Sequence, residues 1–150
     1  MAYVDTVPPE RAGGALAALY ERIAAERGAV AAIHRAASAR PDLLEAHYAF
    51  YRALLWSSRG LGRRLRERIA LAVSEANACR YCATHHGEAL CRVGGAAPDD
   101  PTEAALVGFA RKLTLAPAEI ERADVEALRA AGLGDEEIVD AVFVVGYFAL

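Results

Sequence analysis

Apolar residues recur every three or four positions along almost the whole chain, and this period constrains the fold more than any other feature of the sequence. Such spacing matches one face of an α-helix, whereas a half-buried β-strand needs strict alternation of apolar and polar residues, which is hard to find here. Alanine, the best helix former, dominates the composition. The pattern therefore predicts an all-α fold, a helical bundle of about eight helices with no sheet.

Proline, glycine and asparagine mark the expected helix boundaries. The expected helices are, in chain order, one after Pro8-Pro9 that ends at Gly28, a short one from about Val30, one from Pro41-Asp42 to Leu55, one from Leu61-Gly62 to Asn77, one from close to Cys79 to Gly94-Gly95, one from Asp100 to about Leu115, a short one from about Glu121 to Ala131 and one from about Gly134 to Leu150. The first helix is expected to bury Leu16, Leu19, Tyr20 and Ile23. The fourth has an apolar stripe of Leu65, Ile69, Ala72 and Val73. The clearest start signal is Asp100-Pro101-Thr102-Glu103, which combines an N-cap aspartate, a proline at the first position and the glutamate of a capping box.

Length and charge narrow the class of protein. A chain of 150 residues is the size of one domain, so we expect residues 1–150 to form a single one. The formal net charge of −3 gives no basic footprint, so we expect no nucleic-acid partner. No apolar run approaches the length of a membrane span, and the first residues lack the pattern of a signal peptide. We therefore expect no membrane association and a cytoplasmic location.

The chemistry-bearing stretch is a Cys-x-x-Cys motif followed by a histidine. Cys79 and Cys82 are one helical turn apart, and His86 is one turn beyond Cys82. At about 100° per residue, these three side chains fall within roughly 60° of one another on one helix face, whereas His85 and Cys91 each lie about 120° away from Cys79. His86 is therefore the predicted partner of the dithiol.

Two thiols in the first turn of a helix can close a disulfide, and the helix N-terminus favours a thiolate. A neighbouring imidazole can take or share the proton. Cys82 is the favoured attacking thiol because His86 is one turn away, and Cys79 is the alternative because it lies nearest the helix N-terminus. Together, these groups are what a redox-active dithiol needs.

Glu67 could act as a general base for this dithiol. It precedes Cys79 by twelve residues, which would be about 18 Å along one continuous helix. If the chain folds back at Asn77, however, Glu67 can face the dithiol. The competing interpretation is a surface carboxylate that pairs with Arg63 or Arg64 at helical spacing.

Other uses of these residues remain open. Zinc also binds cysteines and histidines, but a structural site needs four ligands and no second pair follows here, so we expect no metal. A metal-binding or non-catalytic oligomeric module stays an alternative, as does a general thiol–disulfide reductase. Cys91 is predicted to be a core thiol. Tyr81 and His85 are predicted as relay or pocket residues, or simply as packing and surface residues.

The stretch R-E-R-I-A-L-A-V-S-E-A-N-A-C-R-Y-C-A-T-H-H-G resembles the signature of the alkylhydroperoxidase D (AhpD)-like / carboxymuconolactone decarboxylase superfamily, most closely its CxxC-containing, peroxidase-related branch. The resemblance extends more weakly to Leu61-Gly62-Arg63, to the region of Tyr48 and to Asp135-Glu136-Glu137-Ile138, so it covers most of the chain.

The resemblance implies an AhpD-like all-α fold that forms homo-oligomers, commonly trimers or hexamers. It implies an antioxidant thiol peroxidase of the peroxiredoxin type, in which a hydroperoxide oxidises the dithiol and a thiol or lipoyl-type partner reduces it again, without a bound cofactor. By position, the relay residues are Glu67 and His86, and the two redox cysteines are Cys79 and Cys82. The best-studied branch has a second histidine where this chain has Tyr81. The decarboxylase branch lacks the dithiol, which disfavours lactone decarboxylation.

Overall fold

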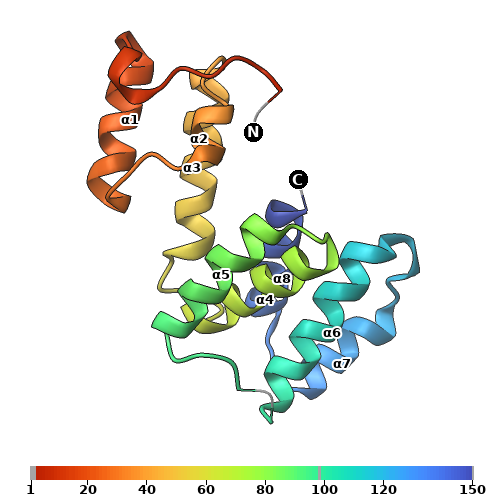
Figure 1. Ribbon diagram of the computed structural model, residues 1–150. Helices are drawn as coiled ribbons and strands as arrows, with labels where there is room; N and C mark the ends of the chain where they lie inside the picture. The colour runs from red at the N-terminus through yellow and green to blue at the C-terminus, as the bar shows by residue number, and fades with distance from the viewer. Residues whose placement is uncertain (1–2, 98, 150) are drawn as a thin grey trace. The chain divides into compact units, whose positions relative to one another are not determined.

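The computed structural model describes residues 3–97 and 99–149, and these contain eight α-helices and two 3-10 turns without a strand, which confirms the predicted all-α fold. The elements are, in chain order, η1 (Pro9–Arg11), α1 (Gly14–Arg27), α2 (Ala32–Ala36), α3 (Pro41–Leu55), α4 (Arg63–Ala76), α5 (Arg80–Arg92), α6 (Pro101–Leu115), η2 (Pro117–Glu119), α7 (Arg122–Ala130) and α8 (Asp135–Phe148) (Figure 1). The chain divides into two compact units, Met1–Tyr51 and Arg52–Leu150.

The boundaries agree closely with the sequence pattern, with one difference at each end. The prolines at the start form only the short turn η1, and α1 begins at Gly14. Gly28 caps α1 in the left-handed conformation, with φ of 83°, as its position predicts. The last predicted helix runs as α8 to Phe148, and Leu150 lies outside the described residues.

The first unit is held together by one face of α1 packed on α3. The core consists of Leu16, Leu19, Tyr20, Ile23, Leu44 and Tyr48. The two tyrosines keep their hydroxyls paired: Tyr20 donates to the Val7 carbonyl at 3.0 Å, and Tyr48 donates to Glu26 at 2.7 Å. Buried aromatic hydroxyls that find partners in this way avoid the cost of an unsatisfied polar group.

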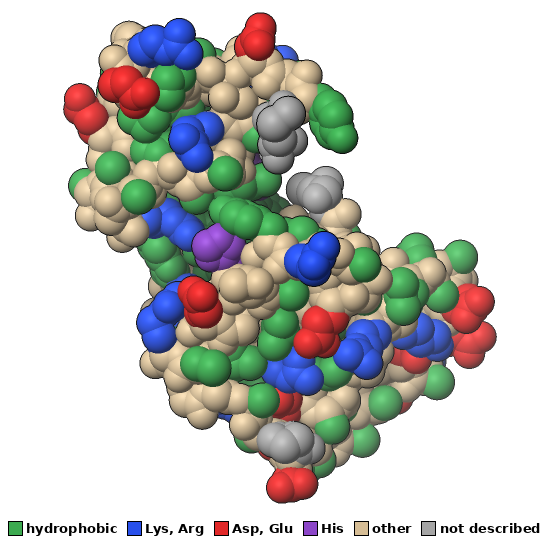
Figure 2. Space-filling view, viewed as in Figure 1, with side chains coloured by type: hydrophobic (Ala, Val, Ile, Leu, Met, Phe, Trp, Pro, Cys, Tyr) green, Lys and Arg blue, Asp and Glu red, His purple; other side chains and the backbone are tan. Residues whose placement is uncertain are grey.

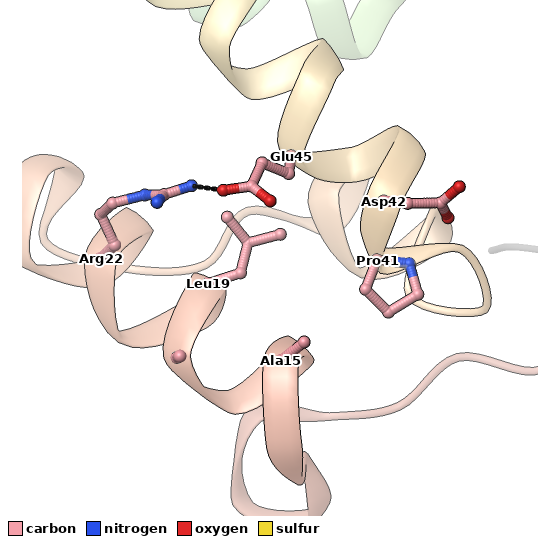
Figure 3. Close-up of a pocket in the computed structure, with 7 residues that line it drawn as sticks. Ala15, Leu19, Arg22, Pro41, Asp42 and Glu45 are labelled. Carbon is pink, nitrogen blue, oxygen red and sulfur yellow. Dashed lines mark hydrogen bonds and ion pairs between the residues drawn. The ribbon is translucent and has the colours of Figure 1, made fainter.

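A shallow groove lies on the first unit between α1 and the start of α3 (Figure 3). Small and apolar side chains from Ala15, Ala18, Leu19 and Pro41 line it, and an Arg22–Glu45 ion pair of 2.9 Å closes one side. None of the residues in the predicted dithiol site lines this groove.

His34 is an unexpected buried histidine of the first unit. Its ring is 2% exposed, stands edge-on to Tyr48 at 5.4 Å, and leaves Nδ1 without a hydrogen-bond partner. Burial, together with the charges of Arg27 and His47, lowers the pKa of His34 to about 4. The neutral imidazole is therefore the form that fits this core.

The second unit is organised around α4, which contacts α5, α6 and α8, while α6 also packs on α7 (Figure 1). The predicted stripe is confirmed for Ile69, Ala72 and Val73, which are all fully buried. Two charged side chains of α4, Arg66 and Glu67, are as deeply buried as this stripe. A period-3.6 pattern of apolar residues gives no sign of them.

Arg66 fixes the loop that precedes α4. Its guanidinium donates to the backbone carbonyls of Ser57 and Arg59 and to the Asp140 carboxylate of α8, the last at 2.8 Å. The same carboxylate oxygen accepts the backbone N–H of Leu61 at 3.0 Å. Gly60, with φ of 63°, passes so close that a Cβ there would collide with Asp140. This loop therefore depends on one ion pair and one glycine.

At the start of α6, one of the two predicted capping interactions is confirmed. Asp100 is the N-cap and accepts the backbone N–H groups of Thr102 and Glu103. The predicted capping-box role of Glu103 is wrong, because its carboxylate accepts the Ala97 N–H and pairs with two arginines of α4, Arg64 and Arg68. Two guanidinium partners hold a buried carboxylate more strongly than a single backbone N–H would.

The surface mixes charges of both signs. On the face drawn in Figure 2, lysine and arginine side chains are interspersed with aspartate and glutamate rather than gathered in one patch. No helix in the described part of the chain combines the length and the apolar character needed to cross a membrane.

Replacing Asp140 should destabilise the protein strongly. We expect Asp140→Ala to lower the free energy of unfolding by about 3–5 kcal/mol, because the buried Arg66 guanidinium loses its carboxylate. Urea unfolding at neutral pH measures this loss. The matched control is Asp135→Ala on the same helix, because its pair with Arg129 is exposed and should contribute little to stability. Equal losses for the two variants would contradict the role of the Arg66 clamp.

Acidification should weaken the protein through His34. The unfolded chain binds a proton at this histidine near its ordinary pKa, whereas the folded chain binds it only near pH 4. The stability conferred by neutral His34 is therefore complete above the unfolded pKa and is lost progressively as the pH falls towards about 4. Urea unfolding of wild type and His34→Phe across this range should give a steeper loss for the wild type. Parallel losses would refute the prediction.

Candidate active site

The connection between α4 and α5 sets up the candidate site. Helix α4 ends at Asn77, and Ala78 adopts the left-handed conformation, with φ of 53°. The Ala78 N–H donates to the Glu75 carbonyl at 3.0 Å and the Cys79 N–H donates to the Ser74 carbonyl at 2.9 Å, which is the hydrogen-bond pattern of a Schellman motif. The chain therefore turns sharply here, and α5 folds back against α4, which meets the condition under which Glu67 could face the dithiol.

Cys79 is both the end of that turn and the N-cap of α5. Its sulfur accepts the backbone N–H of Cys82 at 3.4 Å, and the two sulfurs lie 2.7 Å apart. Both cysteines are free thiols and half-buried. The dithiol therefore sits in the first turn of the helix, where exposed N–H groups and the helix dipole favour negative charge on sulfur.

The two sulfurs are not equivalent. Burial, and then the hydrogen bond and charge of the neighbouring Cys79 sulfur, raise the pKa of Cys82 to about 11. Cys79, by contrast, accepts hydrogen bonds at the helix N-terminus. Because a helix N-cap favours a thiolate, this geometry points to Cys79 as the attacking sulfur, whereas the sequence spacing favoured Cys82.

Glu67 lies on α4 with its side chain only 1% exposed, and it reaches His86 on α5. Its Oε2 is 2.8 Å from His86 Nδ1, and its Oε1 accepts from Arg63 Nε at 2.7 Å. Burial raises the pKa of Glu67, but the hydrogen bond with His86 and the charge of Arg63 outweigh it, so the pKa is lowered. Glu67 is therefore an ionised carboxylate at neutral pH, with a partner on each oxygen.

Each of the two interpretations of Glu67 is correct in part. It does pair with Arg63 at helical spacing, yet it is buried and also holds His86. Arg64, the other predicted partner, turns instead to Asp100 and Glu103. The eleven residues between Glu67 and Cys79 do not hold the two apart as one straight helix would, because the sharp turn at Ala78 brings α5 alongside α4.

Ring contacts define the surroundings of His86. With Glu67 ionised, His86 Nδ1 is the donor of their hydrogen bond, and in a neutral imidazole Nε2 is then the proton acceptor. The His86 ring stands edge-on to Phe148 of α8, with 4.3 Å between centroids. The apolar spacing of the last helix gives no signal of this contact.

The remaining predicted residues lie elsewhere on α5. Tyr81 and His85 are exposed and contact each other, with 4.3 Å between ring centroids. The prediction that Cys91 is a core thiol is wrong, because its side chain is exposed. The helical period explains this, since Cys91 is about 120° around α5 from the dithiol.

Among residues 3–97 and 99–149, no group of three or more histidine, cysteine, aspartate or glutamate side chains is placed to hold a metal ion. What the site does combine is two adjacent thiols, a carboxylate and an imidazole. These groups can exchange electrons at sulfur and move protons at the carboxylate–imidazole pair.

Comparison with known proteins gives consistent findings. Residues 41–114 match the Carboxymuconolactone decarboxylase family. A peroxidase-related protein from Silicibacter sp. TM1040 is 32% identical, with a TM-score of 0.81 over 97% of this chain and 81% of the other. A protein with an alkylhydroperoxidase AhpD core from Ralstonia eutropha JMP134 is 27% identical, with a TM-score of 0.81 over 97% of this chain and 83% of the other.

A third solved structure is a putative antioxidant defence protein from Agrobacterium tumefaciens. It is 25% identical, with a TM-score of 0.65 over 75% of this chain and 85% of the other. No curated protein matches the sequence.

Alkylation should separate the two thiols of the motif. At about pH 7, we expect iodoacetamide to modify Cys79 before Cys82, because the raised pKa keeps Cys82 protonated. Trypsin cleaves after Arg80, between the two cysteines, so mass spectrometry can follow each separately. In Cys79→Ser the neighbouring sulfur is gone, and Cys82 should react faster than in the wild type. Equal rates for both cysteines at pH 7 would contradict the asymmetry.

Proposed function

Because the chain belongs to the carboxymuconolactone decarboxylase family and is AhpD-like, we propose that it is a thiol-dependent peroxidase that reduces hydroperoxides with the Cys79/Cys82 dithiol. The observation that carries the proposal is a pair of free thiols 2.7 Å apart at a helix N-terminus, followed one turn later by an imidazole that a buried carboxylate holds. Peroxidase-related and antioxidant relatives support the same chemistry.

In the first step, the Cys79 thiolate attacks the terminal oxygen of the hydroperoxide. A sulfur–oxygen bond forms and the oxygen–oxygen bond breaks, which gives a Cys79 sulfenic acid and an alkoxide. The alkoxide takes a proton from solvent and leaves as an alcohol. The peroxide gains two electrons, and Cys79 loses two. The N-cap position suits Cys79 to this step, because the thiolate needs no separate base there.

In the second step, Cys82 condenses with the sulfenic acid. Its thiol has a raised pKa and therefore needs a base. His86 follows Cys82 by one helical turn, and its Nε2 is the acceptor once Nδ1 is committed to Glu67. His86 takes the Cys82 proton as the sulfur–sulfur bond forms and delivers it to the departing hydroxide. The products are a Cys79–Cys82 disulfide and water.

The cycle closes when an external dithiol reduces this disulfide. Attack by one external thiolate gives a mixed disulfide, and the second external thiol releases the reduced protein and a cyclic disulfide. A lipoyl-type dithiol has this chemistry, and it is the reductant class we propose. The reaction requires no bound cofactor and no metal. We further propose that the chain acts as a homo-oligomer in the cytoplasm.

One equivalent of an organic hydroperoxide should remove two of the three thiols together. Thiol titration measures the loss. Because Cys82 and Cys91 share the tryptic peptide Tyr81–Arg92, fragment-ion mass spectrometry of the linked peptides should locate the disulfide at Cys82 and the remaining free thiol at Cys91. Cumene hydroperoxide is a suitable probe. Cys91→Ser should react as the wild type does, because its side chain lies on another face of α5.

Single variants assign the order of the cysteines. Cys82→Ser should stop at a Cys79 sulfenic acid, which dimedone traps, and Cys79→Ser should lose the fast reaction. Thiols that survive prolonged excess peroxide in the wild type would refute the peroxidase proposal. If a small disulfide then oxidised the same pair, the general thiol–disulfide reductase would replace it.

A further inference from the structure

We propose that Arg63 is a positioning residue for the Glu67–His86 proton relay. The inference rests on the proposed function, since it concerns how that relay is held. Arg63 Nε donates to Glu67 Oε1 at 2.7 Å, and Nη2 lies 2.5 Å from the same oxygen. Its remaining terminal nitrogen, Nη1, donates to the Leu55 carbonyl at 2.8 Å. The guanidinium therefore joins the end of α3 to the buried carboxylate.

The anchor at Leu55 gives Arg63 a fixed place. Leu55 is the last residue of α3, where a backbone carbonyl has no partner within its own helix. By satisfying that carbonyl, the guanidinium is held at two points, and its planar fork has little freedom to rotate. Glu67 Oε1 is in turn fixed, so Oε2 faces His86 Nδ1. Arg63 reaches the imidazole only through Glu67.

Charge adds to this positioning. Glu67 is buried, and burial by itself favours the neutral acid. Arg63, which keeps 34% of its side chain exposed, supplies a positive charge to the carboxylate while remaining partly hydrated. An ionised Glu67 can only accept from His86, which leaves His86 Nε2 free as a base. A protonated Glu67 could donate a hydrogen bond as well as accept one, so it would no longer determine which nitrogen of His86 carries the proton.

The neighbouring arginines of α4 have different partners. Arg64 and Arg68 bind Glu103, and Arg66 binds Asp140. These three connect α4 to α6 and α8. Arg63 is thus the arginine of α4 whose guanidinium contacts the relay carboxylate, and a change there affects the relay without breaking these links.

The test compares Arg63→Gln, Arg63→Lys and Arg92→Gln. Arg92 is an exposed arginine of α5, and its distant pair with Glu88 makes it a control for the loss of one positive charge. The first readout is a carbon-13 NMR titration of the Glu67 carboxyl group, which needs no peroxide. The second is the pH profile of disulfide formation after cumene hydroperoxide.

For Arg63→Gln, we expect the Glu67 pKa to rise, because an opposite charge in contact is lost. The acid limb of the disulfide-formation rate should move up by a similar amount. Arg63→Lys should keep the Glu67 titration near that of the wild type but slow disulfide formation, because a single ammonium cannot hold both Glu67 and Leu55. In a Glu67→Gln background, Arg63→Gln should slow the reaction no further.

Two results would overturn the inference: a titration and pH profile of Arg63→Gln that match those of Arg92→Gln, or an additive loss in the double variant. If Arg63→Gln does not fold, as judged by near-UV circular dichroism, Arg63→Lys decides, and a wild-type rate for it overturns the inference. If the wild-type protein did not react with peroxide, the proposed function would be refuted instead. A shifted Glu67 titration in that case would still support the hold of Arg63 on Glu67.

Discussion

Glu67 is the residue on which the candidate site depends, because a carboxylate buried on α4 needs partners on both of its oxygens. Arg63 supplies one and His86 the other, at 2.7 and 2.8 Å. A buried, unpaired carboxylate would cost several kcal/mol, so the three side chains stabilise one another only as a set. The pairing with His86 also ties α5 to α4 next to the dithiol. One interaction therefore serves both the packing of two helices and the orientation of an imidazole.

Buried ion pairs with other helices occur at further positions of α4. Arg66 is buried against Asp140 of α8, and Glu103 of α6 is buried between Arg64 and Arg68. Ion pairs of this kind are weak evidence for stability, because desolvation offsets most of the attraction. They do fix geometry, since an ion pair in a low-dielectric interior has few acceptable arrangements. These pairs fix α6 and α8 relative to α4, whereas the Glu67–His86 pair is the one that fixes α5.

Asymmetry within the dithiol follows from its place at a helix start. The N-cap sulfur of Cys79 accepts a backbone N–H, whereas Cys82 is inside the helix and has its pKa raised by burial and by Cys79. In the proposed reaction, this difference separates the task of attack, given to Cys79, from the task of resolution, given to Cys82. His86, one helical turn after Cys82, would serve as the base in the second task. The left-handed conformation of Ala78 turns the chain between α4 and α5, so that α5, which begins at the dithiol, packs against α4.

Much of this protein could be predicted from local patterns. The period of apolar residues determined the all-α class, Gly28 and Asp100 determined helix ends, and the spacing of Cys79, Cys82 and His86 determined which side chains share a face of α5. These succeed because helix geometry and capping depend on residues within one turn of each other.

Tertiary structure alone decided the rest. Four features depend on which helix lies opposite a side chain. They are the burial of Glu67 and Arg66, the pairing of Glu103 with partners other than its expected cap, the contact of His86 with Phe148 and the exposure of Cys91. A charged residue in sequence gives no sign of whether a distant guanidinium or imidazole will meet it. Its burial is favourable only after folding has brought that partner, from another helix, within hydrogen-bond distance.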